Sequence, residues 1–147
     1  MPAPGRRPHA RPYAPLLASL TLLATLGALS VPSAGAAEAQ SCRAETCNGL
    51  DPLTTHCDIA ARTVKFAPLP GGGRLELRWS NMCQANWARV SGVYPGTPIM
   101  VENTVNDWQG ATAGSSTYSH TPMVDGTHSS RAGADFGRDG VYWTLWA

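Results

Sequence analysis

The four cysteines of this chain, Cys42, Cys47, Cys57 and Cys83, are the feature that most constrains how it folds. All of them follow an apolar N-terminal segment that ends in small residues. In an exported protein an even set of cysteines is expected to form disulfides, and each bond typically contributes about 2–4 kcal/mol. Four cysteines allow three pairings. We favour Cys42–Cys47 with Cys57–Cys83, because the second bond would tie an N-terminal loop to the central hairpin.

Residues 1–36 have the pattern of a secretory signal peptide. Three arginines near the start precede an almost wholly apolar run from Leu16 to Val31. Small side chains then stand one and three positions before a cut after Ala36, with a cut after Ala39 as the alternative. A retained transmembrane anchor is the competing interpretation, but a run of about 16 residues is shorter than the usual ~20. We therefore expect a secreted, extracellular protein that keeps no stable membrane anchor after cleavage.

Charge and composition narrow the class of protein further. Three of the 11 basic residues lie in the signal segment, which leaves a formal net charge of −2 on residues 37–147. Without a basic patch to neutralise phosphates, nucleic acid is not an expected partner. The remaining chain is long enough for a single secreted domain with one core. Its many Gly, Pro, Ser and Thr residues favour short strands and turns over helices.

Alternation of apolar and polar residues predicts a mostly β fold. In the clearest strand, Arg74–Trp79, we expect Leu75, Leu77 and Trp79 to share a buried face. A strand over Arg62–Ala67 is expected to place Val64 and Phe66 on one face. Further strands are predicted at 86–94, 99–102, 121–124 and 141–146, with a loop at 127–140. The predicted fold is a small antiparallel barrel or sandwich with a disulfide-pinned N-terminal loop.

The cysteine spacing and the central strands resemble a known family. The pattern is Cys42-x4-Cys47-x-Gly-x-Asp-Pro-x4-Cys57, followed by Leu-Glu-Leu-Arg-Trp-Ser-x2-Cys83 and Trp-Ala-Arg. It is similar to an uncharacterised domain-of-unknown-function family of secreted modules from streptomycetes and other actinobacteria, with YjfA-like relatives in bacilli. The resemblance covers about residues 42–124 and implies export and disulfides without implying a reaction. Members usually carry a further cysteine near the C-terminus, so the tail 125–147 is divergent.

No catalytic residue or cofactor is predicted. The histidines after the signal segment are His56, His120 and His128, and no Gly-x-Ser-x-Gly elbow accompanies them. Zinc on the cysteines with His56 is improbable in an exported chain. A metal held by His120 and His128 would need Asp125 as its third ligand, and we favour solvated loop histidines instead. No metal site is therefore expected.

Tryptophan content supports a binding role. There are five tryptophans, and an indole face stacks well on a sugar ring. Trp79 and Trp87 are expected to pack internally, whereas Trp108, and after it Trp146, are the candidates for exposed ligand contacts. We expect a non-catalytic extracellular module that binds cell-wall polymer, polysaccharide or protein. The alternatives are a small secreted hydrolase or enzyme inhibitor, and a structural protein whose role is assembly.

Overall fold

The computed structural model describes residues 42–147, so the predicted signal peptide and both cleavage positions lie outside the described residues. Residues 42–147 form β-strands joined by turns and three short 3₁₀ helices, η1 (Ala44–Cys47), η2 (Pro70–Gly72) and η3 (Gly137–Asp139). No helix in this part of the chain is long and apolar enough to cross a membrane.

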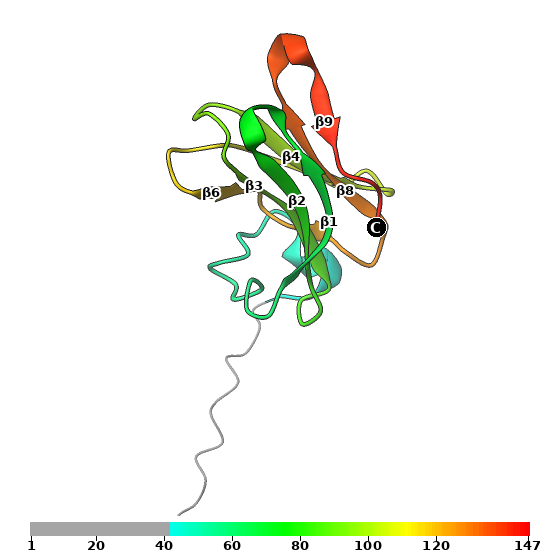
Figure 1. The fold of residues 1–147 in the computed structure, drawn as a ribbon. Helices are drawn as coiled ribbons and strands as arrows, with labels where there is room; N and C mark the ends of the chain where they lie inside the picture. Colours follow the sequence, from blue (N-terminus) through cyan, green and yellow to red (C-terminus); the bar gives the residue numbers. More distant parts are fainter. Residues whose placement is uncertain (1–41) are drawn as a thin grey trace, which may run out of the picture. The chain divides into compact units, whose positions relative to one another are not determined.

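Two antiparallel sheets make up the fold, as Figure 1 shows. The first sheet has the order β1 (Arg62–Pro68), β2 (Arg74–Ser80), β3 (Ala85–Ser91) and β6 (Tyr118–His120), and β7 (Val124–Asp125) pairs with the start of β3. The second sheet has the order β5 (Trp108–Thr112), β4 (Pro98–Asn103), β8 (Ser130–Asp135) and β9 (Val141–Trp143). The predicted mostly β, antiparallel fold is confirmed. Of its two forms the sandwich is present, because each sheet keeps two free edges and no barrel closes.

The core lies between the two sheets. Alternate residues of β2 and β3 face alternate residues of β4 and β8, as expected for aligned sheets. The buried side chains that meet there are Leu75, Leu77, Ala88, Val90, Ile99, Val101, Ala132 and Ala134. The strand residues between them point to the two outer faces, which are the surfaces on which a ligand can be held.

Strand β1 contains a bulge that the alternation did not predict. Thr63 pairs with Arg78 and Lys65 with Leu77, so Val64 is an extra residue on its strand. An extra residue reverses the facing of every residue that follows it. Val64 therefore packs against the core, whereas Phe66 lies on the outer face and is exposed. The expectation that Val64 and Phe66 share a face is wrong.

The predicted loop at 127–140 is also wrong, because β8 occupies Ser130–Asp135 and lies between β4 and β9. Its inward residues are Ser130, Ala132 and Ala134, which are too small to give a hydrophobic alternation. The predicted terminal strand is present as β9 but is shorter. Beyond it the chain stays beside β8, where the N–H and carbonyl of Ala147 bond to the carbonyl and N–H of Ser130.

The N-terminal segment, residues 42–61, has no strand and is held by the two disulfides. Cys42 is bonded to Cys47, and Cys57 is bonded to Cys83 in the turn between β2 and β3. Around the four sulfurs, Trp87 and Met123 form a second buried cluster that covers one end of the outer face of the first sheet. The predicted disulfide-pinned N-terminal loop is thus confirmed.

Removal of the two disulfides is expected to cost different amounts of stability. In the chain-entropy account the cost grows with the length of the closed loop. The sequence separations are 5 and 26 residues. We expect Cys42→Ser with Cys47→Ser to lower the free energy of unfolding by about 2 kcal/mol, and Cys57→Ser with Cys83→Ser by about 3.5 kcal/mol. Urea titrations of the purified, oxidised proteins, followed by tryptophan emission, measure both. Equal losses would contradict the role given to the longer loop.

Candidate functional site

Three tryptophans gather on the outer face of the second sheet. Trp108 begins β5 opposite Glu102, and Trp143 ends β9 opposite Gly133. Trp146 follows β9 on the segment that runs beside β8. Trp108 is 56% exposed and Trp146 41% exposed, which is unusual for such large apolar side chains. We call these three residues with Glu102 and Arg131 the tryptophan face.

Two of the indole rings lie close against the backbone of the sheet. A Cβ atom on Gly110 would collide with the Trp108 ring, and one on Gly133 would stand 2.7 Å from the Trp143 ring. Both glycines therefore provide room that any side chain would fill. The two rings therefore lie along the sheet surface, and the backbone at these glycines lies directly beneath them.

Arg131 joins the members of the tryptophan face. Its guanidinium lies 4.1 Å from the centre of the Trp143 ring and 4.6 Å from the centre of the Trp146 ring. The same group forms an ion pair with Glu102, with 2.6 Å between Nη2 and Oε1. A stacked and paired guanidinium of this kind loses little freedom when a ligand arrives. Arg131 thereby fixes the position of Trp146, which is outside any named strand.

A shallow pocket of about 450 Å³ lies between Trp108 and Trp146. Its remaining wall is the turn from Asn103 to Asp107. Within that turn the Asn103 amide donates to the Asp107 carboxylate, and its carbonyl oxygen accepts from the backbone N–H of Val105 and of Asp107. The structure thus brings together the two tryptophans singled out in the sequence. Sequence reasoning missed Trp143 and Arg131, although the pairing of β8 with β9 places them beside Trp146.

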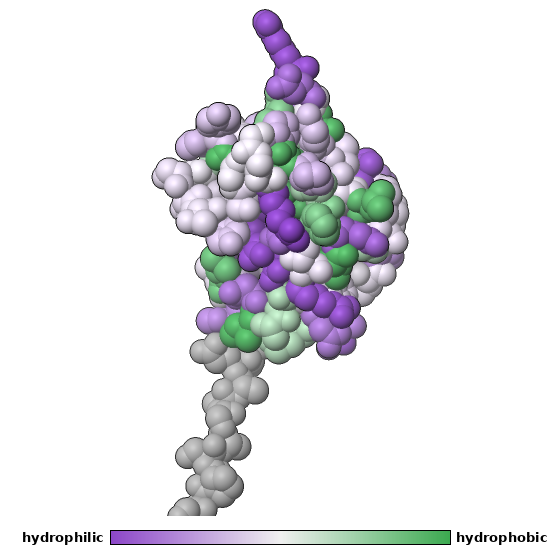
Figure 2. All heavy atoms as spheres, in the orientation of Figure 1, coloured by the Kyte–Doolittle hydropathy of each residue, from purple (hydrophilic) through white to green (hydrophobic). Residues whose placement is uncertain are grey.

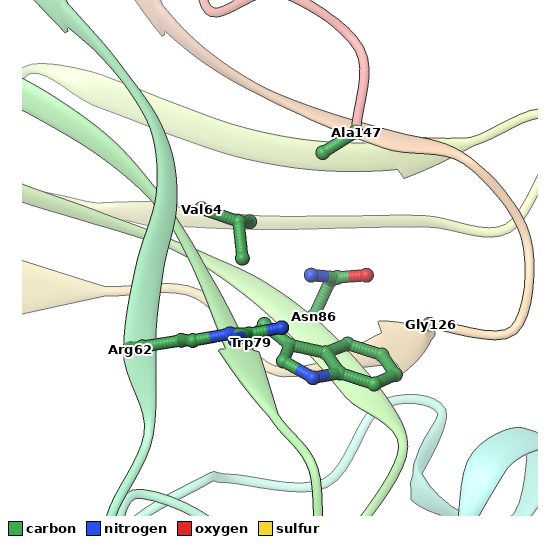
Figure 3. A pocket seen from close by; sticks show the side chains of 6 residues that line it. All are labelled: Arg62, Val64, Trp79, Asn86, Gly126 and Ala147. Carbon is green, nitrogen blue, oxygen red and sulfur yellow. The ribbon is translucent and has the colours of Figure 1, made fainter.

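Trp79 and Trp87, both expected to be internal, differ in their surroundings. Trp87 is 3% exposed and packs in the disulfide cluster. Trp79 is only half-buried, because it lies where the sandwich opens and lines a small pocket of about 200 Å³. Figure 3 shows the Arg62 side chain reaching the Trp79 indole while the Asn86 side chain enters the same hollow. Asn86 also donates to the Arg78 carbonyl, so it has a structural role there.

The outer face of the first sheet carries a different chemistry, centred on a buried carboxylate. Glu76 is 7% exposed and accepts hydrogen bonds from Arg89 at 2.6 Å, Arg74 at 3.1 Å and Thr63 at 3.1 Å. Burial raises the pKa of Glu76, but the hydrogen bond and charge of Arg89, helped by Thr63 and Arg74, outweigh it and lower the pKa from its ordinary value of 4.5. Figure 2 shows strongly hydrophilic residues in the middle of the visible face, with separate hydrophobic residues around them.

His120 is not a solvated loop residue, because it ends β6 and is three-quarters buried. Its Nε2 lies 3.2 Å from the Asp51 carboxylate and so pairs with a carboxylate instead of a serine hydroxyl. Burial raises the pKa of Asp51, but hydrogen bonds from His120 and from the backbone N–H groups of Leu53 and Thr54 outweigh it and lower the pKa. Asp125 is engaged elsewhere, accepting from Thr127.

Residues 42–147 contain one compact group of side chains of the types that bind metals. The one close group of three or more histidine, cysteine or carboxylate side chains there is the set of four cysteines, whose sulfurs lie within 4.8 Å of one another. All four sulfurs are consumed in disulfides, so they do not supply the thiolates that zinc binds.

Comparison with known proteins identifies a family and no activity. Residues 45–134, more than half of the chain, match a family model described as "Protein of unknown function (DUF2690)". The match continues past residue 124 into β8, but Trp143 and Trp146 lie beyond it. No curated protein and no solved structure matches the chain.

A variant at Glu76 is expected to change how stability depends on pH. Glu76→Gln at about pH 7 leaves Arg89 without its carboxylate and should lower the free energy of unfolding by about 2–4 kcal/mol. Because the folded-state pKa is lowered, the stabilisation is full above the unfolded pKa and is lost as the pH falls through the folded pKa. Urea titrations of both proteins from about pH 7 to about pH 2 should therefore converge at the acid end. A difference that stays constant with pH would contradict this account.

Proposed function

This chain belongs to the DUF2690 family of proteins of unknown function, and we propose that it is a non-catalytic extracellular module that binds a polysaccharide. The observation that carries the proposal is the tryptophan face, where exposed indoles lie along an ordered sheet. The two disulfides are compatible with work outside the cell. Secretion after removal of residues 1–36 is part of the proposal.

The chemistry of the tryptophan face suits a sugar chain. One face of a pyranose ring is made of C–H groups, which pack on the face of an indole. The exposed Trp108 ring, which lies against the sheet over Gly110, offers such a surface without prior rearrangement, and the exposed Trp146 ring is held by Arg131. Preorganised contacts of this kind preserve affinity because little conformational freedom is lost on binding.

Polar groups around the same pocket supply the second requirement for sugar binding, which is hydrogen bonding to hydroxyls. The pocket between Trp108 and Trp146 is lined by carboxylate, amide and hydroxyl groups from Glu102, Asn106 and Thr104. Apolar surface with a few convergent polar groups is the usual composition of a small-ligand site. The internally bonded turn from Asn103 to Asp107 holds these groups in place.

The family match does not by itself support a binding site on the tryptophan face, because Trp143 and Trp146 lie outside the matched residues. The expectation that relatives are secreted actinobacterial modules, with YjfA-like forms in bacilli, stays a prediction. A secreted hydrolase or enzyme inhibitor and an assembly protein remain the alternatives, and the experiment below separates them from a polymer-binding module.

We expect the purified, oxidised protein to sediment with at least one insoluble polymer from a panel of cell walls, peptidoglycan, chitin and cellulose. Soluble fragments of that polymer should reverse retention and shift the tryptophan emission, since the indoles then leave water. Trp108→Ala and Trp146→Ala should each weaken retention about tenfold or more, as the loss of one stacking surface implies.

Tyr94→Ala is the matched control, because Tyr94 is an exposed aromatic residue remote from this pocket and 80% accessible. It should bind like the unchanged protein. Failure to sediment with every polymer, or equal weakening by Tyr94→Ala and Trp108→Ala, would overturn the proposal. Release of soluble sugar from a retained polymer would favour the hydrolase, and concentration-dependent oligomers without retention would favour assembly.

A further inference from the structure

A second hollow lies on the outer face of the first sheet, on the other side of the sandwich from the tryptophan face. This pocket of about 440 Å³ forms where the N-terminal segment meets β3 and β6. Its lining includes three basic side chains, Arg78, Arg89 and His120, and the rings of Trp87 and Tyr118. We call it the arginine pocket. None of its lining residues belongs to the tryptophan face.

Arg78 is held in position and still has a buried donor without an acceptor. Its Nη1 donates to the Thr63 hydroxyl and its Nη2 to the Ala61 carbonyl, both at 2.7 Å. Within residues 42–147, Arg78 Nε is the one buried side-chain polar atom without a hydrogen-bond partner. Leaving such a donor unpaired costs about 1–3 kcal/mol, so proteins seldom keep one without a reason.

Arg89 is equally fixed on the neighbouring strand. Its Nε and Nη2 both lie 2.6 Å from the same oxygen of Glu76, and its guanidinium stacks over the Tyr118 ring at 4.8 Å. Both arginines are therefore oriented before any ligand arrives. A pair of preset guanidinium groups is the arrangement that proteins use to hold carboxylates and phosphates.

The carboxylates around this pocket are engaged by groups other than Arg78, or lie farther from it than an ion pair. Glu76 is shared between Arg74 and Arg89, and no carboxylate of residues 42–147 lies within ion-pair distance of the Arg78 guanidinium. Asp58 lines the same pocket and attracts Arg78 from a greater distance. Burial, and then the charge of Arg89, lower the pKa of Arg78, while the charges of Glu76 and Asp58 act in the opposite direction. An anion bound beside Arg78 would stabilise its charged form.

We propose that the arginine pocket binds an oxyanion, a carboxylate or phosphate group carried by an extracellular ligand. The anion lies between Arg78 and Arg89, and the rest of the ligand packs against Trp87 and Tyr118. The volume supports a ligand larger than a bare anion, since one water occupies only about 30 Å³ of liquid. A ring that bears a single acidic group fits this combination of charge and aromatic surface.

Calorimetric titration of the purified, oxidised protein tests the proposal with four probes: inorganic phosphate, acetate, glycerol 3-phosphate and glucuronate. We expect at least one probe to bind, and the phosphate and carboxylate pairs distinguish the source of the oxyanion. Arg78→Gln should weaken that binding about tenfold or more, the loss of one charge-assisted hydrogen bond. Arg138→Gln, an exposed arginine in η3, removes the same charge elsewhere and should leave the affinity unchanged.

A second variant keeps the test decisive if Arg78→Gln fails to fold. Ser116→Glu places a carboxylate at the exposed rim of the pocket and should block the probe, whereas Ser115→Glu adds the same charge next to it. The ¹H–¹⁵N resonance of Arg78 Nε should move with probe concentration in the unchanged protein and in Ser115→Glu, but not in Ser116→Glu. No binding by any probe, or equal binding by both glutamate variants, would overturn the proposal.

Discussion

The bond between Cys57 and Cys83 is the constraint on which one half of this structure depends. It fastens the strandless N-terminal segment to the turn between β2 and β3, and so covers Trp87. The backbone of that segment is also hydrogen-bonded to the rest of the domain, for example from the Gly49 N–H to the Met123 carbonyl. Asp58 reaches the arginine pocket only because this cover is in place. The disulfide therefore holds the N-terminal segment on the outer face, whereas hydrophobic packing holds the two sheets together at the core.

The strands that were predicted from the sequence are those whose inward residues are large. Leu75 and Leu77 in β2, and Ile99 and Val101 in β4, alternate plainly with polar residues and are buried as expected. Strand β8 gave no such signal, because its inward residues, which face β2 and β3 across the core, are the small Ser130, Ala132 and Ala134. The bulge at Val64 was not predicted either, because the alternation of apolar and polar residues does not reveal an extra residue in a strand.

Two residues of the candidate site, Trp108 and Trp146, were named from the sequence, but Trp143, Arg131 and the surface that they form together were not. Trp108 stood out because it lies in polar sequence, and the structure places it beside Trp146 in one pocket. Their proximity follows from the order β5-β4-β8-β9, which no local pattern contains. The arginines of the first sheet alternate with apolar residues in the sequence, and this pattern does not indicate that a pocket forms around them. They are partly buried because the N-terminal segment and β6 cover that face, an arrangement decided by tertiary packing.

The bulge in β1 has a consequence for how copies of this domain meet. β1 is an edge strand of the first sheet, and an intact edge invites another strand to pair with it. Here the extra residue interrupts the ladder, Lys65 stands on the side of Leu77 facing the core, and Pro68 offers no N–H. Each of these features discourages a second chain from adding to the sheet. The β1 edge is therefore protected against the addition of a strand from a second copy, even where copies are concentrated.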